Sequence, residues 1–513
     1  MTTWEDVRDD VSELDDELVA RIGLSITDRE FVTLGGGIGS FCVADALRIA
    51  GVPASAIAVV GESPIPYQRY QDLTANSQVP GPERLRSDSS GMPDNMWSFP
   101  SYAVQEAWQQ KTLAPLFSVA TEPILTDYWT PRAEHVFAAI NRESHRIGYK
   151  GMFIPGHVRA IRRRKGGGYF IICNEVKASH DVQRFAIRAR HVHFAFGYPG
   201  IRFAEELEQY RQADFAGNRL INAYEPHEFV YDALNQAGQG VVAVRGAGIV
   251  SSRVLQRLME DRWKYGTNVQ IRHLIRTFVD GTQIRPFDGR IGTKEKLFYK
   301  RRGGSGFAYQ GYNWPKGSWG GQLKSRIENA DPEDRKAIYA QLGGSHTPYR
   351  RLWQKQTKRA VREGWYSAEQ ATITSIESSP RGGLDCGVAF RQGSDTIHTD
   401  YVIDATGLES GVRKNSVVDD LFKHMRIGEN FMHRIQCEPN FEVRNGRSGQ
   451  ASRLYASGAM TLGSYYVGVD SFLGLQYAAL QVADDLASQG FCKKIGMVRS
   501  FHQWTKWARN SNI

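Results

Sequence analysis

FVTLGGGIGSF, residues 31–41, is the stretch that decides the fold of this chain of 513 residues. A short apolar run, typical of a buried strand, leads into a cluster of glycines. The segment that leaves the cluster has apolar residues at helical spacing up to Ala50. A strand, a glycine turn and a helix in this order present unpaired N–H groups and the positive end of a helix dipole to a pyrophosphate. The stretch therefore predicts a dinucleotide-binding βα unit.

Each small residue of the cluster has an expected part in this site. Gly35 permits the tight turn, and Gly37 lets the backbone approach the phosphates. Gly39 completes the cluster. Ser40 stands where a third glycine is usual, because a small side chain suffices for close packing of helix on strand. We predict that these four residues bind the cofactor.

An acidic residue follows at the place that a dinucleotide site requires. The next apolar strand, AIAVVGE at residues 56–62, ends in Glu62, which lies 27 positions after Gly35 (62 − 35). A carboxylate there accepts hydrogen bonds from the ribose hydroxyls of an adenine dinucleotide. The combination favours a dinucleotide site, and the alternative is an ordinary glycine-rich βα turn.

A second glycine loop, VVAVRGAGIVS at residues 241–251, again follows an apolar strand and opens a helix. Gly246, Gly248 and Ser251 take the places of Gly35, Gly37 and Ser40. The strand after it, residues 269–275, runs into Arg276 and not into an acid. A guanidinium suits a 2′-phosphate, so this site favours NADPH over NADH. The alternative for Arg276 is a solvated strand end.

An internal repeat indicates two related units. Apolar strands end in Ala-x-Gly at Gly197 and at Gly407. The interval from Gly35 to Gly197 matches the interval from Gly246 to Gly407 to within one position. Equal spacing of this kind is the signature of a duplicated unit, here offset by about 210 residues.

Composition limits the function classes. Hydrophobic residues make up 41% and charged residues 23%, which is typical of a soluble globular protein. No apolar run is long enough to span a membrane, and the acidic first thirty residues do not form a signal peptide, so a cytoplasmic location is expected. The net charge of +9 suits anionic ligands and does not indicate nucleic-acid binding. The five cysteines lie far apart with no Cys-x-x-Cys, which argues against structural zinc and a redox-active disulfide, and we expect no metal site.

With both loops and the Ala-x-Gly strands in place, the chain resembles flavoproteins with two dinucleotide-binding domains. The resemblance implies an α/β fold with two Rossmann-like (ββα three-layer) domains, the NAD(P)H domain being inserted in the FAD domain. It implies FAD-binding residues in 1–205 and 401–513 and NAD(P)H-binding residues in 206–400. Gly197 and Gly407 mark the crossings between the domains. The cofactors implied are FAD and NADPH.

The end of the chain also fits this resemblance. Residues 471–483 have the pattern of a helix, with Asp470 as a plausible N-cap and Ser471 as its first residue. In the superfamily such a helix directs its amino end at the flavin pyrimidine, where the reduced flavin carries negative charge. The alternative is a purely structural last helix.

Within the superfamily, the chain resembles class B flavin-containing monooxygenases. Their fingerprint before the second glycine loop is matched by His227 and Tyr231, whereas Ile221, Ala223 and Glu228 depart from it. A Thr-Asn segment ending in Asn76 is similar to the one that places an asparagine near the flavin. The resemblance implies that Asn76 and His227 are catalytic. It also implies that one oxygen of O2 is inserted into a small-molecule substrate through a C4a-(hydro)peroxyflavin.

Two rival functions are open at this point. The first is a flavoprotein dehydrogenase or reductase that inserts no oxygen. The second is a non-catalytic protein that keeps the fold for binding or sensing, against which the intact glycine loops argue. The sequence leaves the oligomeric state open, a homo-oligomer included.

A basic and aromatic insertion at residues 280–365 lengthens the second unit. It is either a lid over the nicotinamide with an anionic-ligand or membrane-surface patch, or a surface insertion. The acidic segment 4–22 has apolar residues at helical spacing and predicts a helix. Its negative charge is compatible with docking on this basic surface, in the same chain or in a partner chain.

Overall fold

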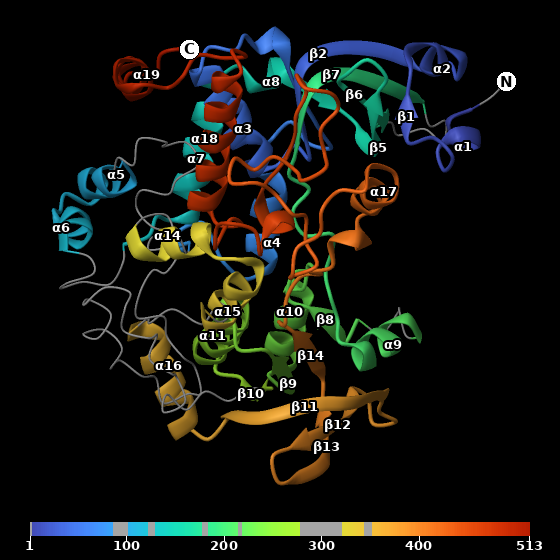
Figure 1. The fold of residues 1–513 in the computed structure, drawn as a ribbon. Helices are drawn as coiled ribbons and strands as arrows, with labels where there is room; N and C mark the ends of the chain where they lie inside the picture. Colours follow the sequence, from blue (N-terminus) through green and yellow to red (C-terminus); the bar gives the residue numbers. More distant parts are fainter. Residues whose placement is uncertain are drawn as a thin grey trace.

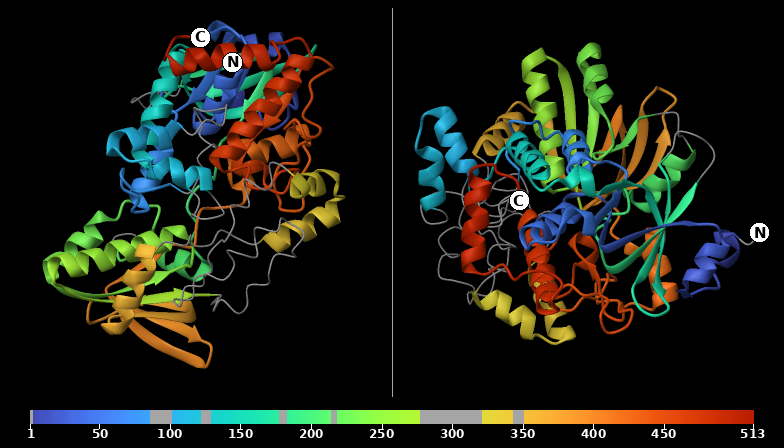
Figure 2. Two further views of the ribbon diagram at one scale, coloured as in Figure 1. Left: turned by 90° about the vertical axis from the view of Figure 1, so that its left-hand side faces the viewer. Right: turned by 90° about the horizontal axis from the view of Figure 1, so that it is seen from above.

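The computed structural model describes residues 3–85, 101–121, 129–176, 183–213, 218–276, 321–342 and 351–513. These residues form two α/β units, drawn one above the other in Figure 1, and each unit is built on its own sheet. Both ends of the described chain lie in the upper, first unit. The lower, second unit is formed by the middle of the chain (Figure 2).

The first unit has an eight-stranded sheet with the order β1-β5-β6-β7-β2-β3-β4, and β15 also pairs with β7. Parallel pairing joins β15 to β7, β7 to β2, β2 to β3 and β3 to β4. Antiparallel pairing joins β5, β6 and β7 in a meander. The strands are β1 (Glu13–Leu14), β2 (Ser25–Leu34), β3 (Ile57–Gly61), β4 (Phe153–Pro155), β5 (His157–Arg164), β6 (Tyr169–Asn174), β7 (Arg184–Phe194) and β15 (Leu454–Ala456).

The second unit has a seven-stranded sheet with the order β13-β12-β11-β10-β9-β14-β8. β8, β14, β9, β10 and the start of β11 are parallel, and the rest of β11 forms an antiparallel meander with β12 and β13. The strands are β8 (Leu220–Asn222), β9 (Gln239–Arg245), β10 (Asn268–Ile275), β11 (Tyr366–Ser378), β12 (Leu384–Phe390), β13 (Gly393–Thr399) and β14 (Tyr401–Asp404).

The two sheets repeat one plan. In each sheet, a strand leads into the glycine loop, and the helix after the loop connects it to a parallel neighbouring strand. A three-stranded antiparallel meander follows later in the chain. The strand on the other side of the first strand is the last strand of this meander in the first unit, and it comes directly after the meander in the second unit. Thus β7 flanks β2 as β14 flanks β9. The fold class predicted from the sequence, two Rossmann-like units with the second inserted in the first, is confirmed.

Helices cover both faces of the first sheet. α3 and α18 pack against each other on one face together with α7, while α17 covers the other. Alternate residues of β2 pack into the hydrophobic cores on opposite faces of the sheet. Phe31 packs on the side of α3, and Val32 and Leu34 pack on the side of α17. The helices of this unit are α1 (Trp4–Val7), α2 (Asp16–Arg21), α3 (Ile38–Ile49), η1 (Ala54–Ala56), α4 (Gln68–Asn76), α5 (Ser101–Gln110), α6 (Ala114–Thr121), α7 (Ala133–Arg146), α8 (Tyr149–Met152), η2 (Val412–Lys414), α17 (Ser416–Met425), η3 (Gly458–Thr461), α18 (Phe472–Ser488) and α19 (Met497–Ala508).

The second sheet is covered in the same manner. α10, α11 and α16 share one core with β9 and β10, and α9 packs beside β11 on the other face. The helices that come from the middle of the chain are α9 (Glu205–Ala213), α10 (Glu228–Ala237), α11 (Ile249–Tyr265), α14 (Gly321–Asn329), α15 (Pro332–Leu342) and α16 (Arg351–Arg362).

The predicted boundary at residue 400 is a few residues too early. β14 at 401–404 pairs with β8 and β9 and so belongs to the second sheet. The chain leaves the second unit only after Gly407, where Leu408 forms a bridge with Ile201 of the outgoing crossing. The two crossings therefore lie side by side.

The prediction of one acidic helix over residues 4–22 is wrong. The segment forms α1, β1 and α2, and β1 adds a strand to the edge of the first sheet beside β5. Its apolar residues cover β5 and β6, and its acids meet arginines of the sheet, such as Asp16 with Arg188 at 2.9 Å. Within the described residues, the segment therefore docks on the first sheet.

The described parts of the insertion 280–365 contact both units. Ile327 of α14 and Ile338 of α15 pack on Val467 of the first unit, and the Tyr339 hydroxyl donates to the Tyr466 carbonyl at 2.8 Å. Trp353 of α16 is buried in the core of the second unit. The aromatic stretch 303–319 lies outside the described residues, so the lid interpretation is not tested by them.

Within the described residues, no helix is long and apolar enough to cross a membrane.

Candidate functional site

The first glycine loop is shaped by the end of β7. Gly35 has φ +113°, and its N–H donates to the Val60 carbonyl at 2.9 Å. A Cβ on Gly35 would lie 2.6 Å from the Ala195 carbonyl oxygen, closer than the two atoms can approach. Only glycine fits here, because both the backbone angle and the neighbouring carbonyl exclude a side chain.

The second loop repeats this geometry. Gly246 has φ +126°, and its N–H donates to the Leu274 carbonyl at 3.1 Å. Its Cβ would lie 2.7 Å from the Ala405 carbonyl oxygen. The Ala-x-Gly strands thus have a physical role in both units: the alanine carbonyl packs on the first glycine of the loop. Two residues later, Gly197 and Gly407 turn with φ +70° and +130°.

The glycine two residues after the first one in each loop faces open space. Gly37 is the N-cap of α3 and Gly248 is the N-cap of α11, with nearly the same extended backbone (φ −87° and −86°). Neither would bring a Cβ within 4 Å of another heavy atom. An open cradle of backbone at a helix amino end is the geometry that a pyrophosphate needs, so both loops fit a dinucleotide.

Gly39, Ser40 and Ser251 act within the loops. A Cβ on Gly39 would lie 2.8 Å from the Ala195 Cβ, so this glycine allows α3 to pack closely on the sheet. The buried Ser40 hydroxyl donates to the Leu34 carbonyl at 3.1 Å, and the buried Ser251 hydroxyl donates to the Gly248 carbonyl at 2.8 Å. These contacts support the shape of the cradles.

Glu62 and Arg276 occupy equivalent places. In the first unit the Gly35 N–H donates to the Val60 carbonyl, and Glu62 lies two residues after Val60. In the second unit the Gly246 N–H donates to the Leu274 carbonyl, and Arg276 lies two residues after Leu274. The Glu62 side chain is 75% exposed and one carboxylate oxygen lies 3.1 Å from His157 Nδ1, while Arg276 is also exposed. One site therefore presents a carboxylate, and the other a guanidinium, where an adenine ribose would lie.

This contrast gives a prediction for Arg276→Ala. NADPH binding should weaken by about 1.5–3 kcal/mol, because one hydrogen bond to a charged group is lost, whereas NADH binding should hardly change. The measurement is the dissociation constant of each nucleotide from fluorescence titration. Equal weakening for both nucleotides would remove the proposed 2′-phosphate contact.

The N-cap of α18 differs from the prediction. Ser471 caps the helix, since its hydroxyl oxygen accepts from the Gly474 N–H at 3.1 Å, and the helix begins at Phe472. Asp470 instead accepts a hydrogen bond from the Tyr198 hydroxyl at 2.9 Å. Tyr198 follows Gly197 on the crossing, so this bond joins the start of α18 to the boundary between the units.

A buried cation lies near the same place. Arg434 is buried and donates from Nη1 to the Ala459 carbonyl at 2.8 Å. Burial lowers the pKa of Arg434, while the Asp470 carboxylate favours its charge. Burial also raises the pKa of Tyr198 far above its usual value, so the phenol stays protonated. The sequence did not single out Arg434 or Tyr198, because neither stands in a local motif.

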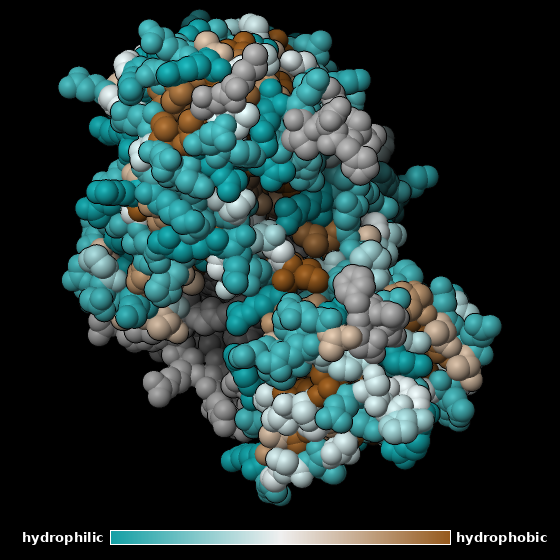
Figure 3. All heavy atoms as spheres, turned by 90° about the vertical axis from the view of Figure 1, so that its right-hand side faces the viewer, coloured by the Kyte–Doolittle hydropathy of each residue, from teal (hydrophilic) through white to brown (hydrophobic). Residues whose placement is uncertain are grey.

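Asn76 lies at the contact between the units. It ends α4, and its Nδ2 donates to the Tyr224 carbonyl in the second unit at 2.8 Å. Next to it, Gln78 donates to Glu228 at 2.9 Å and Arg253 of α11 donates to the Gln78 carbonyl at 3.2 Å. A catalytic role for Asn76 stays a prediction, and its observed contact holds α4 against the second unit. Figure 3 shows the surface narrowing to a waist between the two units.

His227 is held inside the protein by both ring nitrogens. Nδ1 lies 2.7 Å from the Glu225 carbonyl, and Nε2 lies 3.0 Å from the Tyr231 hydroxyl one turn further along α10. The carbonyl fixes the hydrogen on Nδ1, and Nε2 then accepts from Tyr231. Burial lowers the pKa of His227, which favours this neutral form. The His227–Tyr231 pair of the fingerprint is therefore a contact that positions the start of α10, and a direct catalytic role for His227 stays a prediction.

A second buried histidine supports the second loop. His273 of β10 donates from Nε2 to the Gly246 carbonyl at 2.5 Å and accepts at Nδ1 from the Tyr366 hydroxyl at 2.9 Å. Burial lowers the pKa of His273 to about 4. The folded protein therefore keeps this imidazole neutral at about pH 5, whereas the unfolded chain takes up a proton below about pH 6.5.

Acid should therefore destabilise the second unit through His273. Its contribution is fully present above about pH 6.5 and is lost as the pH falls toward 4, the loss reaching about 2 kcal/mol at pH 5. We expect His273→Gln to flatten the pH dependence of the unfolding free energy between about pH 7 and 5, measured by urea denaturation. The exposed His433→Gln is the control. A slope that is the same in both variants would contradict the assignment.

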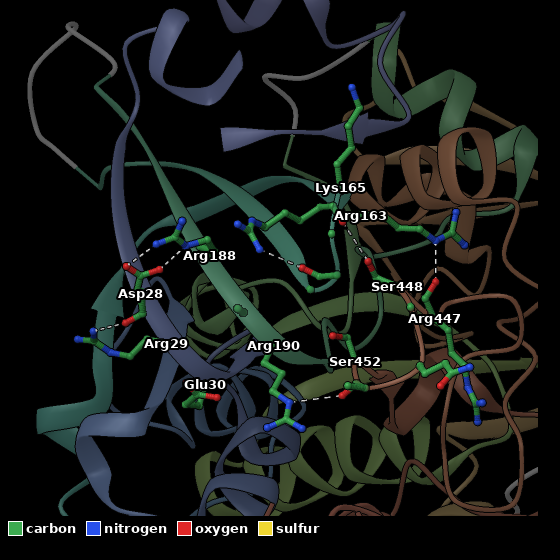
Figure 4. A pocket seen from close by; sticks show the side chains of 18 of the residues that line it. Asp28, Arg29, Glu30, Arg163, Lys165, Arg188, Arg190, Arg447, Ser448 and Ser452 are labelled. Carbon is green, nitrogen blue, oxygen red and sulfur yellow. Dashed lines mark hydrogen bonds and ion pairs between the residues drawn. The ribbon is translucent and has the colours of Figure 1, made fainter. Parts of the chain in front are cut away.

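Another groove lies at the far end of the first sheet (Figure 4). Its volume is about 1060 Å³, and it is lined by the middle of β2 (residues 28–30), η1, the β5–β6 turn, β7 and residues 447–452. One ion pair joins residues of its lining, because Arg188 binds Asp28 at both carboxylate oxygens, and Arg163 donates to the Arg447 carbonyl at 2.8 Å. The groove is therefore separate from the glycine loop at the end of β2.

None of the five cysteines, all of which lie within the described residues, forms a disulfide. Cys42, Cys173, Cys386 and Cys437 are buried, and Cys492 is half-buried. Burial raises the pKa of Cys386 and Cys492 to about 11, which disfavours the thiolate. The described residues also contain no cluster of His, Cys, Asp and Glu that could hold a metal ion.

No family model matches the chain, and no curated protein matches its sequence. Among solved structures, an ornithine hydroxylase from Pseudomonas aeruginosa is similar with a TM-score of 0.61 at 12% identity, covering 90% of this chain and 100% of that one. A cadaverine monooxygenase from Erwinia amylovora, solved with FAD, is similar with a TM-score of 0.62 at 12% identity, covering 90% and 94%. A bacillithiol disulfide reductase from Bacillus cereus is similar with a TM-score of 0.50 at 11% identity, covering 90% and 100%. At these identities the likeness shows a common fold, which agrees with the predicted resemblance to flavoproteins with two dinucleotide-binding domains.

Proposed function

We propose that this chain is an FAD- and NADPH-dependent monooxygenase that acts on a small molecule. One observation carries the proposal: two glycine cradles of the same geometry open at helix amino ends, one followed by Glu62 and the other by Arg276. An acid suits a dinucleotide with a free ribose, and a guanidinium suits a 2′-phosphate. The pair of sites therefore fits one FAD and one NADPH.

The residues of the first unit would hold FAD. Gly37 and the amino end of α3 would receive the pyrophosphate, and Glu62 the adenine ribose. The start of α18 at Ser471 would present its N–H groups to the flavin, and α18 packs beside α3 as this role requires. When bound, FAD supplies the transfer of electrons from NADPH to O2.

The residues of the second unit would hold NADPH. Gly248 and the amino end of α11 would receive its pyrophosphate, and Arg276 its 2′-phosphate. His273 fixes the Gly246 turn, and Asn76 and Gln78 hold α4 on the second unit. These contacts would keep the two nucleotide sites at a constant distance and orientation.

The substrate would lie where the crossings meet the start of α18. Tyr198 and Asp470 present a phenol and an exposed carboxylate there, and Tyr224 follows from the second unit. Similar structures include hydroxylases of ornithine and cadaverine, and Asp470 suits the ammonium of an amine. We therefore propose a primary amine as the substrate class. One oxygen atom of O2 would enter the amine N–H bond, and the other would leave as water.

A disulfide reductase, which is one form of the rival reductase function, receives less support. Its fold is similar, but a reductase with a protein dithiol needs two cysteines within bonding distance and a reactive thiolate. All five cysteines lie in the described part of the chain, where none forms a disulfide and four are buried. Burial raises the pKa of Cys386 and Cys492, which disfavours the thiolate that such chemistry needs.

The test is a coupled assay on the purified chain loaded with FAD. NADPH consumption, O2 uptake and hydrogen peroxide are followed with a panel of aliphatic diamines and diamino acids, and hydroxylamine product is measured by iodine oxidation. Substrate-dependent O2 uptake with hydroxylamine supports the proposal. Rapid NADPH oxidation with an electron acceptor and no oxygenated product would favour the reductase, and a chain that binds no FAD would favour the sensing protein.

A further inference from the structure

The most exposed large apolar side chains gather on one side of the first unit. Among the described residues, the largest exposed fractions are those of Trp108 at 85%, Leu113 at 75%, Met497 at 89%, Val498 at 85% and Phe501 at 66%. They belong to α5, the α5–α6 turn and α19. These helices lie on the same side of the upper unit in Figures 1 and 2. Large apolar side chains exposed together indicate an interaction surface.

α19 is anchored so that its apolar residues face outward. Its inner face buries Gln503 and Trp507, and the Arg142 guanidinium lies 5.6 Å from the Trp507 ring. Before them, Arg499 Nε donates to the Ile49 carbonyl at 2.9 Å. The opposite face carries Met497, Val498 and Phe501, which no core of the described chain covers.

The two segments that carry these exposed apolar residues have more exposed basic than acidic residues. Residues 486–513 contain five basic residues and no Asp or Glu: Lys493, Lys494, Arg499, Lys506 and Arg509. Residues 101–121 of α5 and α6 contain one acid, Glu106, which is buried and paired with Arg84, and one exposed base, Lys111. Basic residues thus flank exposed apolar ones.

We propose that α5, α6 and α19 form a docking face for the surface of an anionic lipid bilayer. Bulky apolar side chains enter the boundary between headgroups and acyl chains, while Lys and Arg bind the anionic headgroups. The face lies on the outside of the first unit, and α19 lies at the end of that unit farther from the second unit (Figure 1). Docking here is peripheral and does not depend on the proposed function.

A lipid surface fits this face better than a second copy of the chain. A symmetric dimer would place the same patch against itself and bring Lys493 and Lys494 of both copies together. The exposed apolar residues also come from separate elements, α5, the α5–α6 turn and α19, and basic residues lie in the same segments. Such an arrangement suits a fluid anionic surface, which adapts to separate anchors.

The test is sedimentation of the full chain with large vesicles of phosphatidylcholine alone or of phosphatidylcholine and phosphatidylglycerol mixed two to one. We expect binding only to the anionic vesicles and its loss at high salt. The variant M497S/V498S/F501S and the variant K493Q/K494Q should each lower the partition coefficient by about tenfold or more. The control L352S/V361S changes two exposed apolar residues of α16 and should bind as the parent does.

Other outcomes would overturn the proposal. These are absence of binding to anionic vesicles, or equal binding of the parent and both α19-side variants. A dimer in solution that dissociates in those variants would assign the face to a second copy instead. Binding to polyglutamate that competes fully with vesicles would assign it to an acidic protein. Circular dichroism and FAD content verify that each variant is folded.

Discussion

Gly37→Val is expected to yield a folded protein that purifies without the yellow colour of bound FAD. Gly37 has an extended backbone that valine adopts readily, and its Cβ would meet no atom within 4 Å. The protein itself therefore tolerates the change. The isopropyl group instead fills the space in front of α3, where the proposal places the pyrophosphate. Loss of two hydrogen bonds to a charged group costs on the order of 3–6 kcal/mol, which lowers FAD affinity by about a hundredfold or more.

The chain offers a matched control for this variant. Gly496 is the N-cap of α19, with φ −78°, ψ 177° and no neighbour within 4 Å of its Cβ. Gly496→Val repeats the same chemical change at a helix start where no dinucleotide is proposed. We expect full FAD content in this control and little FAD in Gly37→Val, measured by absorbance of the released flavin. Normal FAD content in Gly37→Val with retained fold would refute the FAD site.

The parts of the fold that could be predicted from the sequence rest on local constraints. Gly35 and Gly246 must turn with positive φ against a carbonyl, so the loop sequence records the conformation directly. The carbonyl belongs to an Ala-x-Gly strand much further along the chain, and the equal spacing of these strands revealed the duplicated plan. The strand ends Glu62 and Arg276 were located by counting from the same loops.

The parts that were missed depend on contacts distant in the chain. The apolar spacing of residues 4–22 is compatible with a helix, but pairing of Glu13 and Leu14 with the edge strand β5 stabilises an extended segment there. The catalytic roles that the resemblance implies for His227 and Asn76 stay predictions, but the contacts of His227 Nε2 with Tyr231 and of Asn76 Nδ2 with the Tyr224 carbonyl are not visible in the motifs. Hydrogen-bond partners of this kind cannot be inferred from sequence spacing alone.

Asp470 and Ser471 illustrate a finer limit. Both are good N-cap residues, and adjacent candidates are distinguished only by the backbone of the preceding turn. The Ser471 hydroxyl both accepts from the Gly474 N–H and donates to the Gly468 carbonyl at 2.7 Å, which places it at the cap. Because Ser471 caps the helix, the Asp470 carboxylate does not, and it accepts from the Tyr198 hydroxyl instead. It lies at the position that we propose for the substrate.

The second large effect is expected on stability, from Asp420→Ala. Arg162 of β5 is completely buried, and its guanidinium binds both oxygens of Asp420 on α17. It also donates to the Val11 carbonyl at 2.8 Å and the Arg8 carbonyl at 2.9 Å, and so joins the sheet, α17 and the amino-terminal segment. Removing the carboxylate leaves a buried cation without its counter-charge, which costs about 3–5 kcal/mol.

Asp419→Ala on the same helix separates this effect from a general weakening of α17. Asp419 pairs with Lys423 at 3.0 Å and Arg413 at 3.5 Å, and those two basic side chains are at least half exposed. A surface pair of this kind contributes about 0–1 kcal/mol. Urea denaturation should therefore show a large decrease in the unfolding free energy of the first unit for Asp420→Ala and a small one for Asp419→Ala. Since neither aspartate belongs to the glycine loops, both variants should still bind FAD under native conditions. Equal stability of the two variants would mean that Arg162 finds another partner when Asp420 is removed, and that the amino-terminal segment is held mainly by its apolar contacts with β5 and β6.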